Sequence, residues 1–174
     1  YYSNSPVLLD EHFRSAYPII QFSNKEFYGN RIRIMTKDAG TDDVLELHHV
    51  VEGKVDSDCT RNMPEVEAVI KRIHELIAED DGNDENPVSI GIISPFRGQV
   101  DLIQKALCQV LTETTIRKHQ IEVGTAHTFQ GDERDIMILS FAVADNSFVQ
   151  SLTYLQKPNL FNLGITRSSK KLIC

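Results

Sequence analysis

The residues best suited to chemistry lie in a short polar stretch, Gly124 to Asp135, which reads GTAHTFQGDERD and runs directly into the apolar segment IMILSFAVA. Smaller polar clusters occur as EHFRS (11–15), SPFRGQ (94–99) and GITRSSKK (164–171). Arginine side chains can bind phosphate oxygens, and phenylalanine can stack on a flat ring. Each cluster alone is more often solvated charge or packing, so the interpretation depends on all four and on the elements that position them.

The elements around these clusters predict an α/β fold. The runs at 88–94 and 135–142 are apolar without polar alternation, as is typical of central strands in a parallel sheet. A shorter strand is expected at 121–126, and KKLIC (170–174) indicates the start of a last strand. Helices are predicted between them, so the sheet should be mostly parallel. Ligands of such sheets bind beyond the carboxyl ends of the strands.

Three helices are predicted around these strands. The segment 62–80 has apolar residues at helical spacing, and Asn62 and Glu65 can form a reciprocal capping box in which each side chain accepts a hydrogen bond from the other residue's backbone N–H. Segment 159–168 is expected to be helical. Segment 99–111 is a helix with inward-facing residues Val100, Ile103, Leu107, Val110 and Leu111.

The amino-terminal part of the chain gives weaker signals. SAYPIIQFSNKEFYGN predicts a short, irregular helix that ends near Gly29. Residues 31–35 alternate like a half-buried strand, and residues 44–55 read as another extended piece.

Composition narrows the class of protein. The chain has 174 residues, enough for one domain, and a net charge of −7, which gives no overall basic surface for nucleic acid. Three widely spaced cysteines favour a reducing, cytoplasmic compartment over a disulfide framework. No apolar stretch is long enough to span a membrane, and the acidic loop 80–87 lacks the spacing of a calcium loop, so neither membrane nor metal binding is expected.

The four clusters, in this order, resemble the second RecA-like domain of superfamily 1 helicases, of the branch that includes the nonsense-mediated-decay helicase. LLDEHFRSAYPIIQFSNKEFY is similar to the family's aromatic–arginine segment and IGIISPFRGQVDLIQKAL to motif IV. VGTAHTFQGDERDIMILS resembles motif V and FNLGITRSSKKLI motif VI. The resemblance covers nearly the whole chain and implies a three-layer, RecA-like α/β/α fold. The character of motif V favours a bacterial source.

The resemblance implies residues for an ATP site. Arg14 and Arg167 match the family's arginine fingers, which neutralise charge on the transferred phosphoryl group. Glu133 matches a residue that contacts the ribose or the water around the metal ion. Phe13 matches the aromatic that lies against adenine, although it could also be a core residue. Gln130 and Gly131 match the turn that faces the nucleotide.

The resemblance also implies a binding surface for single-stranded nucleic acid, with DNA favoured over RNA. The residues nominated for that strand are Ser94, Pro95, Phe96, Thr125, His127 and Thr128. Two positions depart from the family pattern: Ser169 replaces a second basic residue of motif VI, with Lys170 and Lys171 following, and His127 replaces an acidic residue found in many relatives.

A phosphate-binding loop is missing from this sequence, because GxxxxGK[ST] does not occur and the EGKV of 52–55 lacks the following Ser or Thr. ATP and Mg²⁺ are therefore expected to be bound mainly by an upstream RecA-like domain, and residues 1–174 alone are expected to be inactive. The parent protein is predicted to be an ATP-hydrolysing helicase or translocase. The alternatives are an ATP-controlled nucleic-acid-binding switch that does not unwind processively, and an α/β interaction domain with accidental motif matches.

Overall fold

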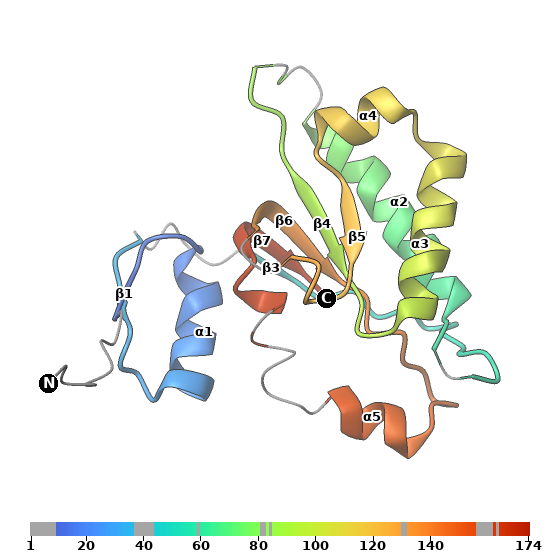
Figure 1. The fold of residues 1–174 in the computed structure, drawn as a ribbon, viewed down its shortest axis with the longest axis horizontal. Coiled ribbons are helices and arrows are strands. Elements are labelled where there is room, and N and C mark those ends of the chain that lie inside the picture. The colour runs from blue at the N-terminus through green and yellow to red at the C-terminus, as the bar shows by residue number, and fades with distance from the viewer. Residues whose placement is uncertain are drawn as a thin grey trace, which may run out of the picture.

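A five-stranded parallel sheet forms the centre of the computed structural model, which describes residues 10–36, 44–58, 60–80, 83, 85–129, 132–155, 162 and 164–174 (Figure 1). The strands lie in the order β3-β7-β6-β4-β5, and each neighbouring pair is parallel. Their bounds are β3 Leu45–Glu46, β4 Ile90–Ile93, β5 Glu122–Gly124, β6 Arg134–Leu139 and β7 Ser168–Ile173. The predicted α/β class and the parallel sheet are confirmed.

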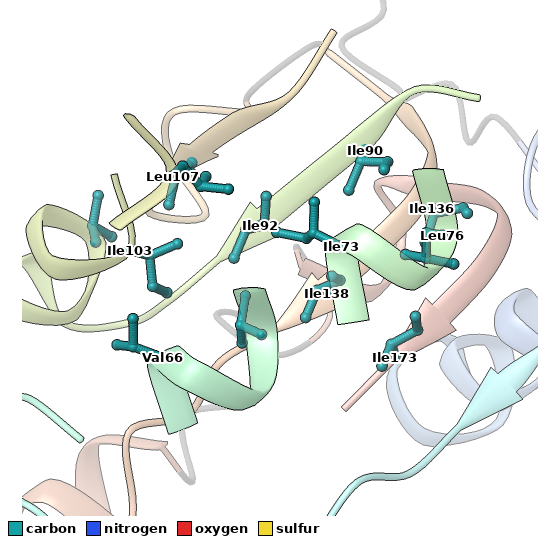
Figure 2. Close-up of a cluster of buried hydrophobic side chains, with 13 residues drawn as sticks. Val66, Ile73, Leu76, Ile90, Ile92, Ile103, Leu107, Ile136, Ile138 and Ile173 are labelled. Carbon is teal, nitrogen blue, oxygen red and sulfur yellow. The ribbon is translucent and has the colours of Figure 1, made fainter. Parts of the chain in front are cut away.

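One face of the sheet is covered by α2 (Met63–Glu79) and α3 (Arg97–Val110), which lie side by side (Figure 1). Inward residues of both helices meet alternate residues of the central strands. The apolar spacing seen in the sequence therefore becomes one contiguous core (Figure 2). Its buried members are Val66, Val69, Ile73, Leu76, Ile90, Ile92, Val100, Ile103, Leu107, Val123, Ile136, Ile138 and Ile173.

The opposite face of the sheet has a second, smaller core. Ile19 of α1 (Tyr17–Tyr28) packs there with Phe129, which is fully buried, and with strand residues such as Met137 and Leu172. Ile165, in the helical piece before β7, completes this layer. Helices and loop segments thus lie on both faces, as in the predicted three-layer arrangement.

The connection from β5 to β6 shapes this second face. It leaves the carboxyl end of β5 at the sheet edge, passes β4, and enters β6 at its amino end. Parallel strands are usually joined through a helix, but residues 125–129 form turns here and no helix occurs among the described residues of the connection. Phe129 anchors the connection in the core, so its residues are placed at both ends of the sheet.

The amino-terminal elements form a small unit beside the sheet. β1 (Glu11–His12) pairs in parallel with β2 (Arg33–Ile34), and α1 connects them. Gly29 ends α1 in the left-handed conformation at φ 59°, which glycine adopts without penalty. The Asn24 side chain fixes the segment between α1 and β2, because it accepts a hydrogen bond from Ile32 N and donates one to Ile32 O.

Several local predictions need correction. The strands expected at 31–35 and 44–55 shrink to two residues each in β2 and β3. Val110 is 49% exposed, so it does not face the core. Two helices, α4 (Glu113–Lys118) and α5 (Val149–Leu155), were not predicted from the sequence. The helix expected at 159–168 is helical at the described residues 162, 164 and 165, but Thr166 and Arg167 form a turn.

The predicted capping box is half correct. Asn62 caps α2 by accepting a hydrogen bond from Glu65 N, but its own N–H donates to the buried Gln99 side chain of α3 at 2.8 Å. Glu65 instead accepts from the Ser140 hydroxyl at 2.7 Å and from Ala142 N at 3.0 Å. Glu65 also accepts from Nδ2 of Asn62 at 3.2 Å, so the two side chains stay in contact. The cap joins α2 to α3 and to the segment after β6, because Gln99 binds the backbone N–H of Asn62 in place of Glu65.

Candidate functional site

Arg14, Glu133 and Arg167 come together from three segments that lie far apart in the sequence. Arg14 follows β1, Glu133 directly precedes β6, and Arg167 directly precedes β7. Since β6 and β7 are parallel neighbours, Glu133 and Arg167 stand at the same amino-terminal edge, where Arg134 N donates to Arg167 O at 3.1 Å. Arg14 Nε forms an ion pair with Glu133 Oε2, and both side chains are about half exposed.

The loop that carries Arg14 is held against the sheet by backbone contacts. Ala16 N donates to Ser169 O of β7 at 2.8 Å, and the Thr36 hydroxyl donates to Ser15 O at 3.0 Å. Within the loop, Ser15 N donates to Nε2 of His12 at 2.9 Å. These contacts fix the backbone on both sides of Arg14 while its side chain remains accessible.

Electrostatics show that the two arginines act on each other. Partial burial, followed by the positive charge of Arg14, lowers the pKa of the Arg167 guanidinium, while the negative charge of Glu133 opposes this shift. A guanidinium starts from a pKa above about 12, so Arg167 stays protonated at neutral pH. Two cations thus share one carboxylate, and the surplus positive charge suits a multiply charged anion such as a polyphosphate.

Arg134 has a structural role that sequence reasoning missed. Its side chain is buried, donates to Gln120 O and Glu133 O, and pairs with Glu122 at 2.6 Å and Asp132 at 2.9 Å. The two neighbours Glu133 and Arg134 could have formed a surface ion pair with each other. Instead, Arg134 binds the Glu133 carbonyl and leaves the Glu133 carboxylate to Arg14.

The predicted adenine-facing residues have different outcomes. Phe13 is 67% exposed, so the alternative that it is a core residue is wrong, and its ring is available for a flat ligand. Gln130 and Gly131 lie outside the described residues.

Most residues nominated for the nucleic-acid strand lie at the other end of the sheet. Pro95, Thr125 and His127 line a pocket of about 280 Å³ whose remaining walls are mainly apolar, including Ile93 and Leu139 at the carboxyl ends of β4 and β6. His127 and Thr128 are exposed. Phe96 is half-buried at the position before α3. α5 lies beyond these strand ends and adds Leu155 to the pocket (Figure 1).

Two of the nominated hydroxyls hold the loops in place. Ser94 is fully buried, and its Oγ accepts a hydrogen bond from Phe96 N at 3.4 Å, so it supports the turn from inside. The Thr128 hydroxyl accepts from Thr125 N at 3.1 Å. A Cβ on Gly124 would lie 2.5 Å from the Thr128 Cβ, so only glycine allows Thr128 to close over the end of β5.

The polar clusters do not all lie beyond the carboxyl ends of the strands, where ligands of parallel sheets usually bind. The nominated strand-binding residues lie at those ends, whereas Glu133 and Arg167 lie at the amino ends of β6 and β7. The polar stretch 124–135 reaches both places because it contains the connection between β5 and β6.

The basic residues that follow Arg167 are engaged elsewhere. Lys170 pairs with Asp135 at 2.9 Å, and Lys171 pairs with Glu46 of β3 at 2.6 Å. Glu46 also binds both Nε and Nη2 of Arg72 and contacts His48, and these partners outweigh its burial and lower its pKa to about 2. Neither lysine therefore replaces the second basic residue of motif VI, whose position Ser169 occupies.

The part of the chain that the structure describes contains no group of three His, Cys, Asp or Glu side chains arranged to hold a metal ion. None of its helices is both long and apolar enough to cross a membrane.

Comparison with known proteins shows the family of the chain. A family model described as an AAA domain matches residues 1–174. The chain is 25% identical to helicase SEN1 of Saccharomyces cerevisiae over 98% of its own length, and 28% identical to the uncharacterized ATP-dependent helicase MG140 of Mycoplasma genitalium over 95%. It is 29% identical over 50% of its length to a regulator of nonsense transcripts 1 homolog of Neurospora crassa, of which it covers 8%.

The matched segments are small parts of these relatives: the chain spans 8% of SEN1 and 16% of MG140. Among solved structures, the C-terminal domain of a possible DNA helicase from Lactobacillus plantarum superposes with a TM-score of 0.54 at 18% identity, covering 92% of this chain and 84% of that one. This likeness supports the RecA-like fold.

Proposed function

We propose that this chain, which belongs to the AAA domain family and is the second RecA-like domain of a superfamily 1 helicase, completes an ATP site whose phosphate-binding loop lies in an upstream domain. Arg14 and Arg167 act as arginine fingers, and the carboxyl ends of the strands grip single-stranded nucleic acid. Closing and opening of the two domains would then move the strand. The parent protein is an ATP-driven helicase or translocase.

The observation that carries this proposal is the convergence of Arg14, Glu133 and Arg167 at one edge of the sheet. Arg14 lies 119 residues before Glu133, and Arg167 lies 34 residues after it, so three separate segments place two cations at this edge. An isolated surface charge needs no such convergence. A site that must meet a polyphosphate held by another domain requires cations that project outward from a rigid edge.

The chemistry assigned to these residues follows from the charge that develops in phosphoryl transfer. ATP bound with Mg²⁺ in the upstream domain supplies the phosphoanhydride bond that is cleaved. Arg14 and Arg167 neutralise charge on the transferred phosphoryl group, which contributes about 10³–10⁵ in rate in related systems. Glu133 gives up its ion pair with Arg14 and contacts the ribose or the water around the metal ion. Phe13 stacks on the adenine ring.

The strand-binding role is assigned to Pro95, Phe96, Thr125, His127 and Thr128, with Ser94 supporting their loops. Backbone and hydroxyl groups near Thr125 suit phosphate oxygens, and an aromatic ring can stack on any base. Single-stranded DNA is the proposed substrate. The connection 125–133 touches both ends of the sheet, and so offers a route by which strand binding and ATP hydrolysis influence each other.

The test is the ATPase activity of the complete parent protein, with and without single-stranded DNA, for wild type and Arg167→Ala. We expect the variant to lose about a hundredfold or more in kcat while still binding ATP. Arg117→Ala is the matched control, because Arg117 is exposed on α4 and pairs only locally with Glu113. Equal rates for wild type and Arg167→Ala would contradict the finger assignment. Strand affinity that responds to ATP without turnover would indicate a binding switch.

A further inference from the structure

A histidine closes the loop that carries Phe13 and Arg14. His12 is the last residue of β1, and its Nε2 accepts a hydrogen bond from Ser15 N at 2.9 Å. The bond spans the two residues between them, whose side chains project outward: Phe13 is 67% exposed and the Arg14 side chain 45%. Its geometry resembles a helix cap, in which a side chain fixes the backbone three residues later.

We propose that His12 is a positioning residue for the ATP site, which aims Phe13 and Arg14 by holding the backbone N–H of Ser15 with an unprotonated Nε2. This inference rests on the proposed function of Arg14 and Phe13. His12 itself need not touch the nucleotide.

The anchors around the loop explain why this bond matters. On one side, His12 pairs with Ile34 of β2, and Met35 N donates to His12 O. On the other side, Ser15 O accepts from Thr36 and Ala16 N donates to Ser169 O. The His12–Ser15 bond joins these anchors directly across Phe13 and Arg14. Without it, the two exposed residues would gain backbone freedom between fixed ends.

The bond works in only one protonation state. An imidazole whose Nε2 accepts must carry its single proton on Nδ1, and a second proton would point Nε2–H at the Ser15 N–H. Partial burial and the nearby charge of Arg14 lower the pKa of His12, and Glu133 acts in the opposite direction. The other charged groups of this small sheet, Asp10, Glu11 and Arg33, pair with one another. The neutral, accepting form therefore dominates at neutral pH.

A pH profile of the complete parent protein separates this role from simple packing. Strand-stimulated ATPase is measured between about pH 5 and 8 for wild type, His12→Gln and His12→Ala. The amide oxygen of glutamine reaches the position of Nε2 and accepts a hydrogen bond at every pH. We expect wild type to lose kcat in acid with a midpoint below the ordinary histidine value, and His12→Gln to lack that decline.

His12→Ala is expected to lose at least about tenfold in kcat at neutral pH, since a misplacement of about 1 Å can cost about 10²-fold. KM for ATP should change less than kcat, because the upstream domain holds most of the nucleotide and Phe13 supplies only the stacking contact. The inference is overturned if His12→Gln keeps the wild-type acid decline, or if His12→Ala turns over at the wild-type rate. Arg14→Ala, measured alongside, distinguishes failure of the His12 inference from failure of the proposed function. If Arg14→Ala is also fully active, the assignment of Arg14 as an arginine finger is wrong.

Discussion

The two ends of the sheet are built on different principles. At the amino end, Arg14 and Glu133 are half-exposed charges beside the partly buried Arg167, and their segments are fixed through backbone contacts such as Ala16 N to Ser169 O. At the carboxyl end, the loops are fixed by buried groups, including Ser94 and the close contact of Gly124 with Thr128, around a mainly apolar pocket. A side chain that contacts another domain needs an accessible and mobile head group. A surface that binds a strand needs loops fixed in a shape complementary to it.

The largest difference between the two ends of the sheet is expected when a proposed arginine finger is removed. Arg14→Ala in the parent protein should lower kcat about 10³-fold or more, because the charge at the transferred phosphoryl group is no longer neutralised. The dissociation constant for single-stranded DNA should stay within about threefold. Steady-state ATPase and fluorescence anisotropy measure the two quantities. A large loss of strand affinity with normal turnover would reverse the roles assigned to the two ends.

Phe129 anchors the connection that runs between the two ends of the sheet, so removing its ring should destabilise both ends. Phe129→Ala is expected to lower the free energy of unfolding by about 3–5 kcal/mol, because a fully buried phenylalanine leaves a cavity between Ile19 and Met137. Urea unfolding followed by circular dichroism provides the measurement. Phe22→Ala is the matched control: Phe22 is 43% exposed, so its loss should cost much less. Equal losses would mean that the ring does not anchor the connection.

The effect of acid on stability should differ between the partly buried ion-pair cluster around Glu46 and the exposed Arg14–Glu133 pair. The Glu46 carboxylate has a pKa lowered to about 2 by Arg72, Lys171 and His48, so its stabilisation is complete above its ordinary pKa near 4.5 and is lost as the pH falls toward 2. We expect about 1–3 kcal/mol from this cluster. Unfolding free energies at several pH values would show the loss in wild type and not in Glu46→Gln. The exposed Arg14–Glu133 pair should contribute at most about 1 kcal/mol.

The smallest effect expected is confined to the carboxyl end. Gly124→Ala forces its new Cβ against Thr128 and should weaken strand binding about tenfold, with strand-independent ATPase unchanged. Fluorescence anisotropy with labelled single-stranded DNA measures the strand affinity. If Gly124→Ala binds the strand normally, the closure of Thr128 over β5 is not part of the grip.

Sequence patterns predicted the elements whose signals are local and strong. The apolar runs became β4 and β6, the helical spacing after Asn62 became α2, and Gly29 ended α1. In contrast, β2 and β3 are only two residues long, because strand length depends on the neighbour that supplies hydrogen bonds. The N–H of Asn62 likewise went to Gln99, a partner 37 residues away that no local rule identifies.

The candidate site was predicted as a set of residues and not as an arrangement. Motif resemblance named Arg14, Glu133 and Arg167, and the structure brings them together. Their separation from Thr125 and His127 could not be read from the sequence, because it depends on the connection between β5 and β6, whose described residues form no helix. Arg134 was missed for a related reason: its partners, Glu122 and Gln120, become neighbours only when the strands pair.

The buried position of Phe129 has a consequence for how such domains can diverge in evolution. The ring fixes one point of the connection in the core, with Thr125 to Thr128 on one side and Asp132 and Glu133 on the other. An insertion before this point would remodel the strand-facing loop and leave Glu133 where it is. An insertion after it would do the reverse. Under the proposed assignment of roles, mutation can therefore change strand binding and ATP turnover separately within one short peptide, provided that residue 129 stays large and apolar.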